Sequence, residues 1–466
     1  MLELLGSGLI SLWLDMAGVH VNTLDALDVL SWQSSPGLVI APDPNPAWAT
    51  TVDQYLKGLQ AAKLSPADQG VWIQSGPMLM ANNQGNVPLP AASLSKIATT
   101  LAALKTWGPS HQFQTLVSAT GPVQNGILQG DLIIQGGNDP FFIWEEAIAL
   151  ANSLNQLGIK HVTGNIIVTG NFAMNYQLDP KLAGDMFKQA LNSATWPREA
   201  AIQYTFMPKG TPKPQLTVAG KVQVVGQGFS PMPRIPAPNL APNPGVSIPG
   251  GMEKAQASAP SASGRLLIRH LSLPLARIVK EMNIYSNNEI AEMLAQSVGG
   301  AEAVRSIAST EARVPLSEVQ LVNGSGLGLQ NRISPRAVCA MFMAIQRYAG
   351  SYQMNVADLF PVVGVDHRGT TYARHIPTAS VVKTGTLNDV SSLAGVMPTR
   401  DRGLVWFAIL NRGNNVSGFR TEQDKLLQAL SLQLQVAPAP ASISTRPILN
   451  PYADVGAANR NEVVKS

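Results

Sequence analysis

Three short patterns of serine, lysine, asparagine and glycine could carry chemistry in this chain of 466 residues. In chain order they are Ser93-x-x-Lys96, Ser286-x-Asn288 and Lys383-Thr384-Gly385. A serine hydroxyl becomes an effective nucleophile only when a neighbouring base takes its proton. A lysine amine can be that base only if burial or a second positive charge lowers its pKa. The patterns therefore predict Ser93 as a nucleophile and Lys96 as its base, with Lys383 supplying the second charge.

The spacing within each pattern is informative only on the right kind of secondary structure. On a helix, positions i and i+3 share a face about 5–6 Å apart, so Ser93 and Lys96 can touch if a helix starts near Ser93. The same pattern recurs at Ser380 and Lys383, but in a strand these positions point to opposite faces. A serine at a helix start also keeps its backbone N–H free to bind an oxyanion. We therefore expect Ser93, not Ser380, to be the nucleophile.

Hydrophobic periodicity predicts the elements that must position these residues. A helix is expected from Ser93 to about Trp107, and a capped helix should begin at Ser272-Leu273-Pro274 with helical structure to about residue 349. A final helix is expected at about 418–434. Alternating segments predict a hairpin at 70–82 and a three-stranded antiparallel meander at 380–411.

The region between the first two patterns has a different texture, with hairpins and short helices. A strand runs from Gly130 into a turn at Asp139-Pro140, a helix is expected over Trp144–Leu157, and a strand over His161–Thr169. Residues 230–263 are dense in Pro, Ala, Gly and Ser, which predicts an extended connection without a core of its own.

The three patterns together resemble the signature of penicillin-recognising serine enzymes. More specifically, the chain is similar to the low-molecular-mass class C penicillin-binding proteins, the D-alanyl-D-alanine carboxypeptidase/endopeptidase group, over roughly residues 45 to 430. The further matching segments are Pro90-Ala91-Ala92-Ser93-Leu94-Ser95-Lys96, Gly130-Asp131-Leu132 with Asp139-Pro140, Asn323-Gly324-Ser325-Gly326-Leu327 with Asn331, and Lys383-Thr384-Gly385-Thr386-Leu387.

The resemblance implies an α+β fold (an α/β sandwich): a penicillin-recognising serine transpeptidase-like domain with an antiparallel sheet flanked by helices and an inserted smaller β-rich domain. The expected organisation is an apolar leader or anchor at 1–40, a catalytic domain at 41–115 and 270–436, an inserted domain with a Pro-rich connection at 116–269, and a disordered tail at 437–466. The gap from Lys96 to Ser286 is short for the group, so one inserted domain is expected, with a second one reduced or missing.

The resemblance also implies a role for each matched residue. Ser93 would attack the carbonyl between two D-alanines, Lys96 would be the acylation base, and Ser286 would relay protons to the leaving amine. Asn288 would hold the substrate amide, Lys383, Thr384 and Gly385 would form the site for the terminal carboxylate, and the N–H groups of Ser93 and Thr386 would bind the oxyanion. The implied partners are a peptidoglycan stem peptide ending in D-Ala-D-Ala and β-lactam antibiotics.

The sequence departs from the group's pattern near residue 323. The group shows Asp-Gly-Ser-Gly-Leu-Ser-Arg there, whereas this chain has Asn323 in place of the Asp and Gly328-Leu329 in place of Ser-Arg. The missing basic residue leaves recognition of the peptide's side-chain terminus open. Asp139 could contact that side chain instead; equally, it could cap a turn before Pro140.

Composition and residue spacing narrow the classes of function that the chain could have. The net charge is +4 without any run of basic residues, which argues against nucleic-acid binding. The single cysteine, Cys339, lies in an apolar stretch and is expected to be buried. The histidines lack metal-ligand spacing, so neither a metal nor a cofactor is expected.

The N-terminal segment is apolar but carries acidic interruptions at Glu3 and Asp15 and no basic start. A degenerate export signal, an interfacial anchor in peripheral contact with a membrane, and a helix packed on the body all fit it. No apolar run of about 20 residues predicts a transmembrane span. The substrate implied by the resemblance places the protein in the periplasm or cell envelope.

Two other functions share the three patterns. A serine β-lactamase would need fast deacylation, and the Glu-x-x-x-Asn element of class A enzymes is not recognisable between the first patterns. A non-catalytic penicillin-fold binding protein would be expected to have lost one of the patterned residues, and none is lost. Cross-link endopeptidase activity would use the same residues as carboxypeptidase activity.

Overall fold

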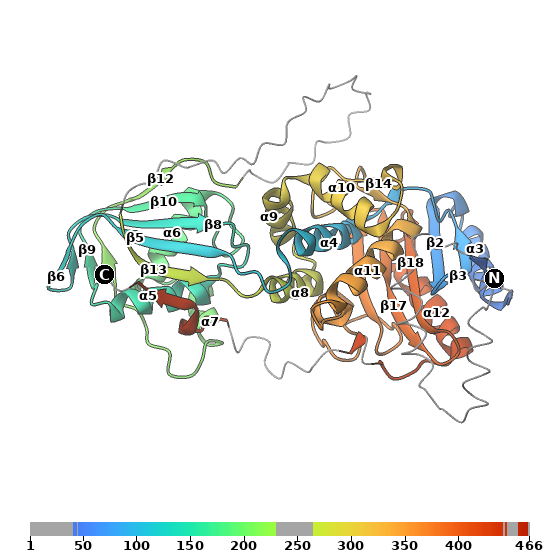
Figure 1. Ribbon diagram of the computed structural model, residues 1–466. Helices are drawn as coiled ribbons and strands as arrows, with labels where there is room; N and C mark the ends of the chain where they lie inside the picture. The colour runs from blue at the N-terminus through green and yellow to red at the C-terminus, as the bar shows by residue number, and fades with distance from the viewer. Residues whose placement is uncertain (1–40, 44, 230–263, 441–442, 445–454, 465–466) are drawn as a thin grey trace, which may run out of the picture. The chain divides into compact units, whose positions relative to one another are not determined.

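The computed structural model describes residues 41–43, 45–229, 264–440, 443–444 and 455–464. The expected leader at 1–40 and the Pro-rich connection at 230–263 lie outside these residues. The chain forms two compact units (Figure 1). The first comprises the described parts of Met1–Pro109, Leu275–Ala291 and Val298–Pro447, and the second those of Ser110–Pro274, Glu292–Ser297 and Ile448–Ser466.

The first unit contains a six-stranded sheet. In spatial order its strands are β1 (Ala41–Pro42), β3 (Met78–Asn83), β2 (Gln69–Ser75), β18 (Gly403–Arg412), β17 (Val390–Thr399) and β16 (Val381–Leu387). All neighbours are antiparallel except β1 and β3, which are parallel. The predicted hairpin is β2–β3 and the predicted meander is β16–β17–β18, so both predictions are confirmed.

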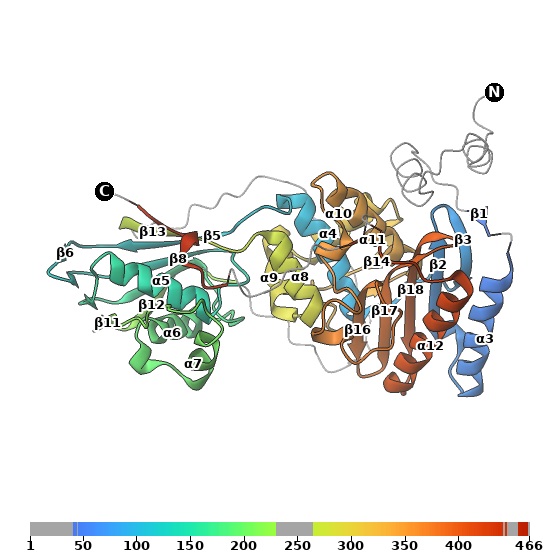
Figure 2. The same ribbon diagram turned by 90° about the horizontal axis from the view of Figure 1, so that it is seen from below.

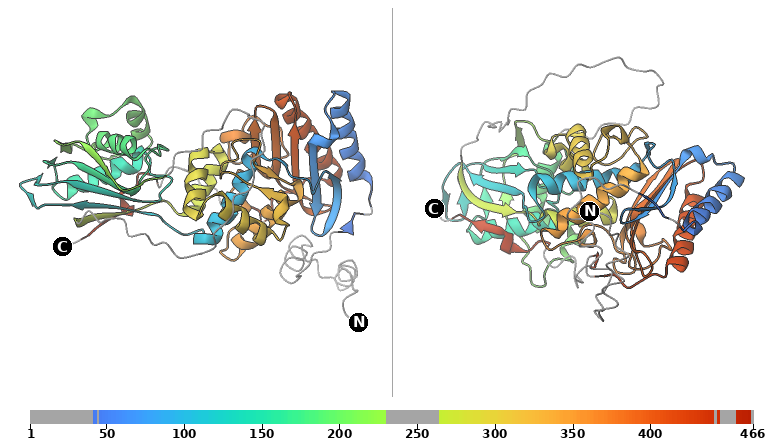
Figure 3. Two further views of the ribbon diagram at one scale, coloured as in Figure 1. Left: turned by 90° about the horizontal axis from the view of Figure 1, so that it is seen from above. Right: turned by 45° about the vertical axis from the view of Figure 1, so that its right-hand side comes forward.

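Helices cover both faces of this sheet. Helices α3 (Ala47–Ala61) and α12 (Val416–Leu434) lie together on one side (Figures 2 and 3), where Trp48 and Phe419 share a core with Ile73 of β2. Adjacent side chains of a strand point to opposite faces. Gln74, the next residue along β2, accordingly donates to Met343 Sδ of helix α11 (Pro335–Gly350) at 3.6 Å. Cys339 in α11 is buried, as predicted.

The remaining helices of this unit carry the candidate site. They are α4 (Ser95–Trp107), α8 (Leu275–Tyr285), α9 (Asn288–Val298) and α10 (Ala301–Ala312). Within α9, Glu292–Ser297 are grouped with the second unit. A small sheet of β14 (Val319–Gln320), β15 (Arg332–Ile333) and β4 (Leu89–Pro90) leads the chain into α4. The helix predicted from Ser93 begins two residues later, since Ser93 itself lies in a 3₁₀ turn, η2 (Ala92–Leu94).

The second unit is the inserted domain, and it combines two sheets with three helices. Its main sheet has the order β12 (Val222–Val225), β10 (Ile166–Asn171), β8 (Leu132–Gly137), β5 (Gln114–Ala119), β13 (Arg265–Leu271) and β19 (Asn461–Val463). A second sheet has the order β11 (Thr217–Val218), β9 (His161–Val162), β7 (Ile127–Leu128) and β6 (Val123–Gln124). Three helices accompany them, α5 (Trp144–Gln156), α6 (Pro180–Ala190) and α7 (Arg198–Tyr204).

Two local predictions need correction. The strand expected over His161–Thr169 is broken at Thr163–Asn165, where the chain passes from β9 in one sheet to β10 in the other. Asp131 Oδ1 accepts a hydrogen bond from Asn165 N at 2.6 Å and fixes this crossing. Ser272 does not cap a helix, because its Oγ accepts from Phe113 N at 2.9 Å and α8 begins only at Leu275.

The tail predicted to be disordered at 437–466 is also corrected. Residues 461–463 form β19, which pairs antiparallel with β13. The 3₁₀ turn η8 (Ala458–Arg460) precedes it, and Arg460 is buried. Composition alone suggested disorder because the residues that hold this segment lie about 190 to 310 positions earlier in the chain.

The ends of the insert differ slightly from the predicted boundaries of 116 and 269. The inserted segment of the second unit runs from Ser110 to Pro274, because β5 and β13 pair antiparallel and bring both ends of the insert together.

Among the helices that the structure describes, none is long and apolar enough to cross a membrane.

Candidate active site

Ser93 and Lys96 are in contact at the start of α4. Lys96 Nζ lies 2.9 Å from Ser93 Oγ, and it donates to Asn288 Oδ1 at 2.8 Å and to the Ser325 carbonyl at 2.7 Å. The Lys96 side chain is fully buried, while Ser93 is half-buried. Ala92, immediately before the nucleophile, has a φ of +49°, which is strained for a residue with a side chain. The expected contact between serine and lysine is therefore present.

Ser286 and Asn288 lie at the junction of α8 and α9. Ser286 has a φ of +57°, so the chain turns sharply there, and Asn288 is the first residue of α9. Asn287 Oδ1 accepts from Ile290 N at 2.8 Å and holds the start of this helix. The turn directs Asn288 to Lys96 and Ser286 to Lys383, whose Nζ donates to Ser286 Oγ at 2.8 Å.

Lys383 lies in β16 with its side chain fully buried. Its Nζ also donates to the Thr384 carbonyl at 2.7 Å. Burial, and secondarily the nearby charge of Lys96, hold the pKa of Lys383 well below its ordinary value. It is therefore unfavourable for both buried amines to be protonated at the same time.

Gly385 places β16 directly against the nucleophile. A Cβ atom at this position would lie 2.2 Å from Ser392 Oγ and 2.9 Å from the backbone nitrogen of Ser93. Ser392 Oγ in turn donates to the Ala91 carbonyl at 2.8 Å. Only glycine permits this approach of strand and turn, which gives the third residue of the Lys-Thr-Gly pattern a steric reason.

A fourth contributor is the turn at 323–327. Asn323 Oδ1 accepts from Gly326 N at 2.8 Å, and its amide donates to the Leu327 carbonyl at 2.7 Å. Gly326 has a φ of +86° and packs so closely on the Ala92 carbonyl that a Cβ would lie 1.9 Å from it. Asn323 thus closes the turn whose Ser325 carbonyl binds Lys96. The contact of this turn with Lys96 joins positions 229 residues apart, so no local pattern could have predicted it.

These elements surround an open pocket of about 650 Å³. Its lining residues include Ser93, Ser286, Asn288, Leu327, Thr370, Arg374, His375, Thr384, Thr386, Arg420 and Asp424. The predicted residues Thr384 and Thr386 reach the pocket, whereas the Lys383 amine is directed to Ser286 and is not part of the lining. Binding of a carboxylate by Lys383, as expected from the sequence, stays a prediction.

Three pocket residues were missed by motif reasoning. Thr370 Oγ1 lies 2.7 Å from Thr384 Oγ1, Arg420 Nη2 donates to Thr386 Oγ1 at 2.8 Å, and Arg374 forms a two-pronged ion pair with Asp424. They come from the segment before β16 and from α12, where no short pattern marks them.

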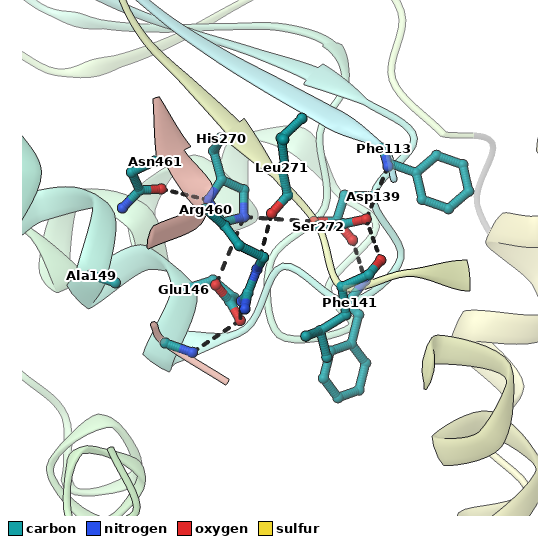
Figure 4. Close-up of polar contacts among 12 residues, drawn as sticks. Phe113, Asp139, Phe141, Glu146, Ala149, His270, Leu271, Ser272, Arg460 and Asn461 are labelled. Atoms are coloured by element: carbon teal, nitrogen blue, oxygen red, sulfur yellow. Dashed lines mark hydrogen bonds and ion pairs between the residues drawn. The ribbon is translucent and has the colours of Figure 1, made fainter. Parts of the chain in front are cut away.

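Asp139 lies in the second unit and its side chain is only 3% exposed. Its Oδ1 accepts from Phe141 N at 2.8 Å, so it caps the turn at Pro140, the second of the two expected roles. Figure 4 shows it in a buried polar cluster with His270, Glu146, Arg460 and Asn461. Substrate cannot reach a side chain so enclosed, and the expected contact with the peptide is corrected.

Ion pairs and hydrogen bonds hold this cluster together. Arg460 pairs with Glu146 and donates through Nε to the Leu271 carbonyl at 3.1 Å (Figure 4). His270 Nδ1 lies 2.7 Å from Asn461 Oδ1, and its Nε2 lies 4.0 Å from Asp139 Oδ2. Burial lowers the pKa of His270 and raises that of Asp139 to about 7. A neutral imidazole beside a protonated carboxyl is the state that burial favours.

No group of three or more His, Cys, Asp or Glu side chains is arranged to hold a metal ion in the parts of the chain that the structure describes. The residues gathered at Ser93 can instead accept and pass on protons around a serine hydroxyl. Their arrangement suits acyl transfer.

Comparison with known proteins agrees with this chemistry. The sequence matches the D-Ala-D-Ala carboxypeptidase 3 (S13) family over residues 51–215 and 239–432, well over half of the chain. The D-alanyl-D-alanine carboxypeptidase DacB of Haemophilus influenzae is 24% identical over 395 residues, which cover 70% of this chain and 80% of the relative. A D-alanyl-D-alanine carboxypeptidase of an Actinomadura species is 24% identical over 450 residues, with coverages of 80% and 83%.

Solved structures share the fold. The penicillin G-acylated predatory endopeptidase Bd3459 of Bdellovibrio bacteriovorus, bound to an immunity protein, superposes with a TM-score of 0.65 at 20% identity, covering 81% of this chain and 96% of that chain. Penicillin-binding protein 4 of Haemophilus influenzae gives 0.57 at 18% identity, with coverages of 82% and 99%. The predicted fold class is confirmed.

Proposed function

Because the chain belongs to the D-Ala-D-Ala carboxypeptidase 3 (S13) family of serine hydrolases, we propose that it removes the terminal D-alanine of peptidoglycan stem peptides through an acyl intermediate on Ser93. The observation that carries this assignment of the nucleophile is the 2.9 Å contact between Ser93 Oγ and the buried Lys96 amine. A β-lactam, which offers a strained amide to the same nucleophile, would acylate Ser93 as well.

Acylation begins with proton transfer from Ser93 Oγ to the neutral amine of Lys96. The Oγ attacks the carbonyl carbon between the two D-alanines, and the resulting oxyanion receives hydrogen bonds from the backbone N–H groups of Ser93 and Thr386. Buried donors of this kind typically contribute several kcal/mol to transition-state stabilisation. Asn288 both orients Lys96 and holds the substrate amide at the pocket wall.

Collapse of the intermediate needs a proton on the leaving nitrogen. The proton that Lys96 took from Ser93 reaches that nitrogen through Ser286 Oγ, which Lys383 Nζ holds in place by donating a hydrogen bond at 2.8 Å. The C–N bond breaks, D-alanine leaves, and Ser93 carries an ester of the shortened peptide. A water molecule then attacks the ester, and Lys96, neutral again, accepts its proton and returns it to Ser93 Oγ as the shortened peptide leaves.

Labelling with a fluorescent penicillin tests the nucleophile. We expect wild-type protein to retain a covalent label and Ser93→Ala to retain none, while both proteins unfold at similar temperatures. D-alanine release from a pentapeptide ending in D-Ala-D-Ala should be lost in the same variant. The Ser380→Ala variant is the matched control, since Ser380 also precedes a lysine by three residues, and it should keep both activities.

Other outcomes separate the alternatives. Rapid hydrolysis of the penicillin without a lasting label would identify a β-lactamase. Absence of both label and turnover would identify a non-catalytic binding protein.

A second activity, cleavage of D-Ala cross-links, is favoured by the structural similarity to a predatory endopeptidase. The same acylation chemistry applies, with a cross-linked peptide in place of D-alanine as the leaving group. Digestion of purified cross-linked muropeptide dimers would reveal it as monomer formation that disappears in Ser93→Ala. Either activity requires access to the cell wall, so we propose the periplasm or cell envelope as the site of action.

A further inference from the structure

A cation in the pocket would stabilise the carboxylate next to the scissile bond, and the Lys383 amine has its contacts elsewhere. The Lys383 amine is buried, is directed to Ser286 Oγ and the Thr384 carbonyl, and is absent from the pocket lining. Arg374 does line the pocket, but Asp424 Oδ1 neutralises its guanidinium at 2.7 Å. A substrate carboxylate would therefore meet neither an accessible lysine nor an uncompensated Arg374.

Arg420 differs from both of these cations. It is solvent-exposed on α12, lines the same pocket, and donates through Nη2 to Thr386 Oγ1 at 2.8 Å. Among the described residues, no carboxylate lies within ion-pair distance of it. A guanidinium offers five donors in a planar fork that matches a carboxylate, and this hydrogen bond occupies only one of them.

The backbone of Arg420 is fixed by the contacts of helix α12 with its surroundings. Arg374 Nη2 donates to the Arg420 carbonyl at 3.3 Å, and Arg374 is itself bound to Asp424 one turn further along α12. Phe419, the preceding residue, is buried in the core between α12 and the sheet. The backbone of Arg420 is therefore held at the pocket rim while its side chain reaches to Thr386.

The contact with Thr386 has a second consequence. Because Thr386 Oγ1 accepts a hydrogen bond from Arg420, the hydroxyl proton of Thr386 remains available to donate into the pocket. The Thr384 hydroxyl is also present there, 2.7 Å from Thr370 Oγ1. The guanidinium of Arg420 on α12 and the hydroxyls of Thr384 and Thr386 on β16 therefore line the same pocket.

We propose that Arg420 is a substrate-binding residue that pairs with the α-carboxylate of the leaving group, together with the hydroxyls of Thr384 and Thr386. This assignment rests on the proposed function and deepens it: the enzyme selects acyl donors that carry a free carboxylate beside the scissile bond. Lys383 is then left to serve Ser286, as its contacts indicate.

The test compares two peptides, one ending in D-Ala-D-Ala with a free carboxylate and the other in D-Ala-D-Ala amide. Binding is measured in the Ser93→Ala background, so that the readout does not depend on turnover. Adding Arg420→Ala should weaken binding of the acid peptide about 10- to 100-fold, as for loss of a charge-assisted hydrogen-bonded pair, and leave the amide peptide within about twofold. Arg420→Lys should recover part of the loss because it restores the charge.

Lys425→Ala is the matched control, since it removes one positive charge from the same helix at a residue paired with Glu422 and outside the pocket. It should leave binding of both peptides unchanged. Equal losses for acid and amide peptides in Arg420→Ala would mean that Arg420 only supports Thr386, and unchanged binding of the acid peptide would mean that it has no role; either result overturns the inference. Both results leave labelling of Ser93 intact in the otherwise wild-type chain, so they are distinguishable from failure of the proposed function.

Discussion

At the scale of single residues, the site depends on two close approaches that only small groups allow. Gly385 brings β16 against the Ser93 backbone, and Gly326 brings the 323–327 turn against the Ala92 carbonyl. Together with the strained φ of Ala92, these contacts hold the nucleophile between a strand and a turn. Reactivity at Ser93 therefore depends on backbone packing as much as on the lysine beside it.

Gly385→Ala should impair acylation without unfolding the protein. The added methyl group would meet Ser392 Oγ and the Ser93 backbone nitrogen, so the strand and the turn must separate. A misplacement of about 1 Å at reacting groups can lower a rate about 100-fold, and we expect a loss of that order in the rate of penicillin labelling.

Gly58→Ala is the control for this change, because Gly58 lies in α3 with open space around its Cα. It should leave the labelling rate unchanged and slightly raise the melting temperature, as alanine is the better helix former by about 1 kcal/mol. Equal labelling rates for Gly385→Ala and wild type would contradict the steric role given to Gly385.

At the scale of elements, the C-terminal strand completes the sheet of the second unit. Strand β19 pairs with β13, and Arg460 just before it pairs with Glu146, a side chain only 2% exposed. Asn461 adds contacts to His270 and Ser153 at 2.7 and 3.0 Å. A segment remote in sequence thus neutralises a buried charge in α5.

Arg460→Met should therefore destabilise the second unit strongly. Removing one partner of a buried ion pair leaves an uncompensated charge and typically costs about 3–5 kcal/mol. Hydrogen exchange of amides in β5, β8 and β13, measured on the full chain, should accelerate accordingly. Arg269→Ala breaks the neighbouring surface pair with Glu462, which is about half exposed, and should cost less than about 1 kcal/mol. Equal losses of stability in the two variants would show that burial does not make the Arg460–Glu146 pair more important than the surface pair.

At the scale of the whole molecule, burial of acidic groups links stability to pH. Desolvation raises the pKa of Asp139 from 3.8 to about 7, with the charge of Glu146 adding to it, and raises that of Glu145 from 4.5 to about 7. The folded state therefore binds protons that the unfolded state has released between about pH 4 and pH 7. Stability falls as pH rises through this window, because the unfolded state binds fewer protons there.

Asp139→Asn should flatten this dependence. The amide keeps the acceptor for Phe141 N but does not titrate, so the variant should gain stability relative to wild type as pH rises from 4 to 7. The relative gain is expected to be a few kcal/mol at most, since one pKa unit corresponds to about 1.4 kcal/mol. Denaturant unfolding at pH 4.5 and 7.5 measures it, and parallel pH profiles of variant and wild type would contradict it.

Much of the fold followed from local pattern. The β2–β3 hairpin, the β16–β18 meander, α5 and α12 lie close to where periodicity predicted them, because each is specified by neighbouring residues. The errors occurred where distant residues decide the outcome. Asp131 interrupts the strand after Val162, Phe113 engages Ser272, and β13 and α5 order the tail.

The sequence by itself determined the kind of chemistry and the residues around the nucleophile. Ser93 and Lys96 are three positions apart, so the helical repeat alone brings them together, and the order of the three patterns indicated the family. Only the tertiary structure decided that Lys383 turns to Ser286, that Arg420 stands at the pocket, and that Asp139 is enclosed. Those outcomes depend on side chains from elements far apart in the chain, whose burial and pairing no local spacing encodes.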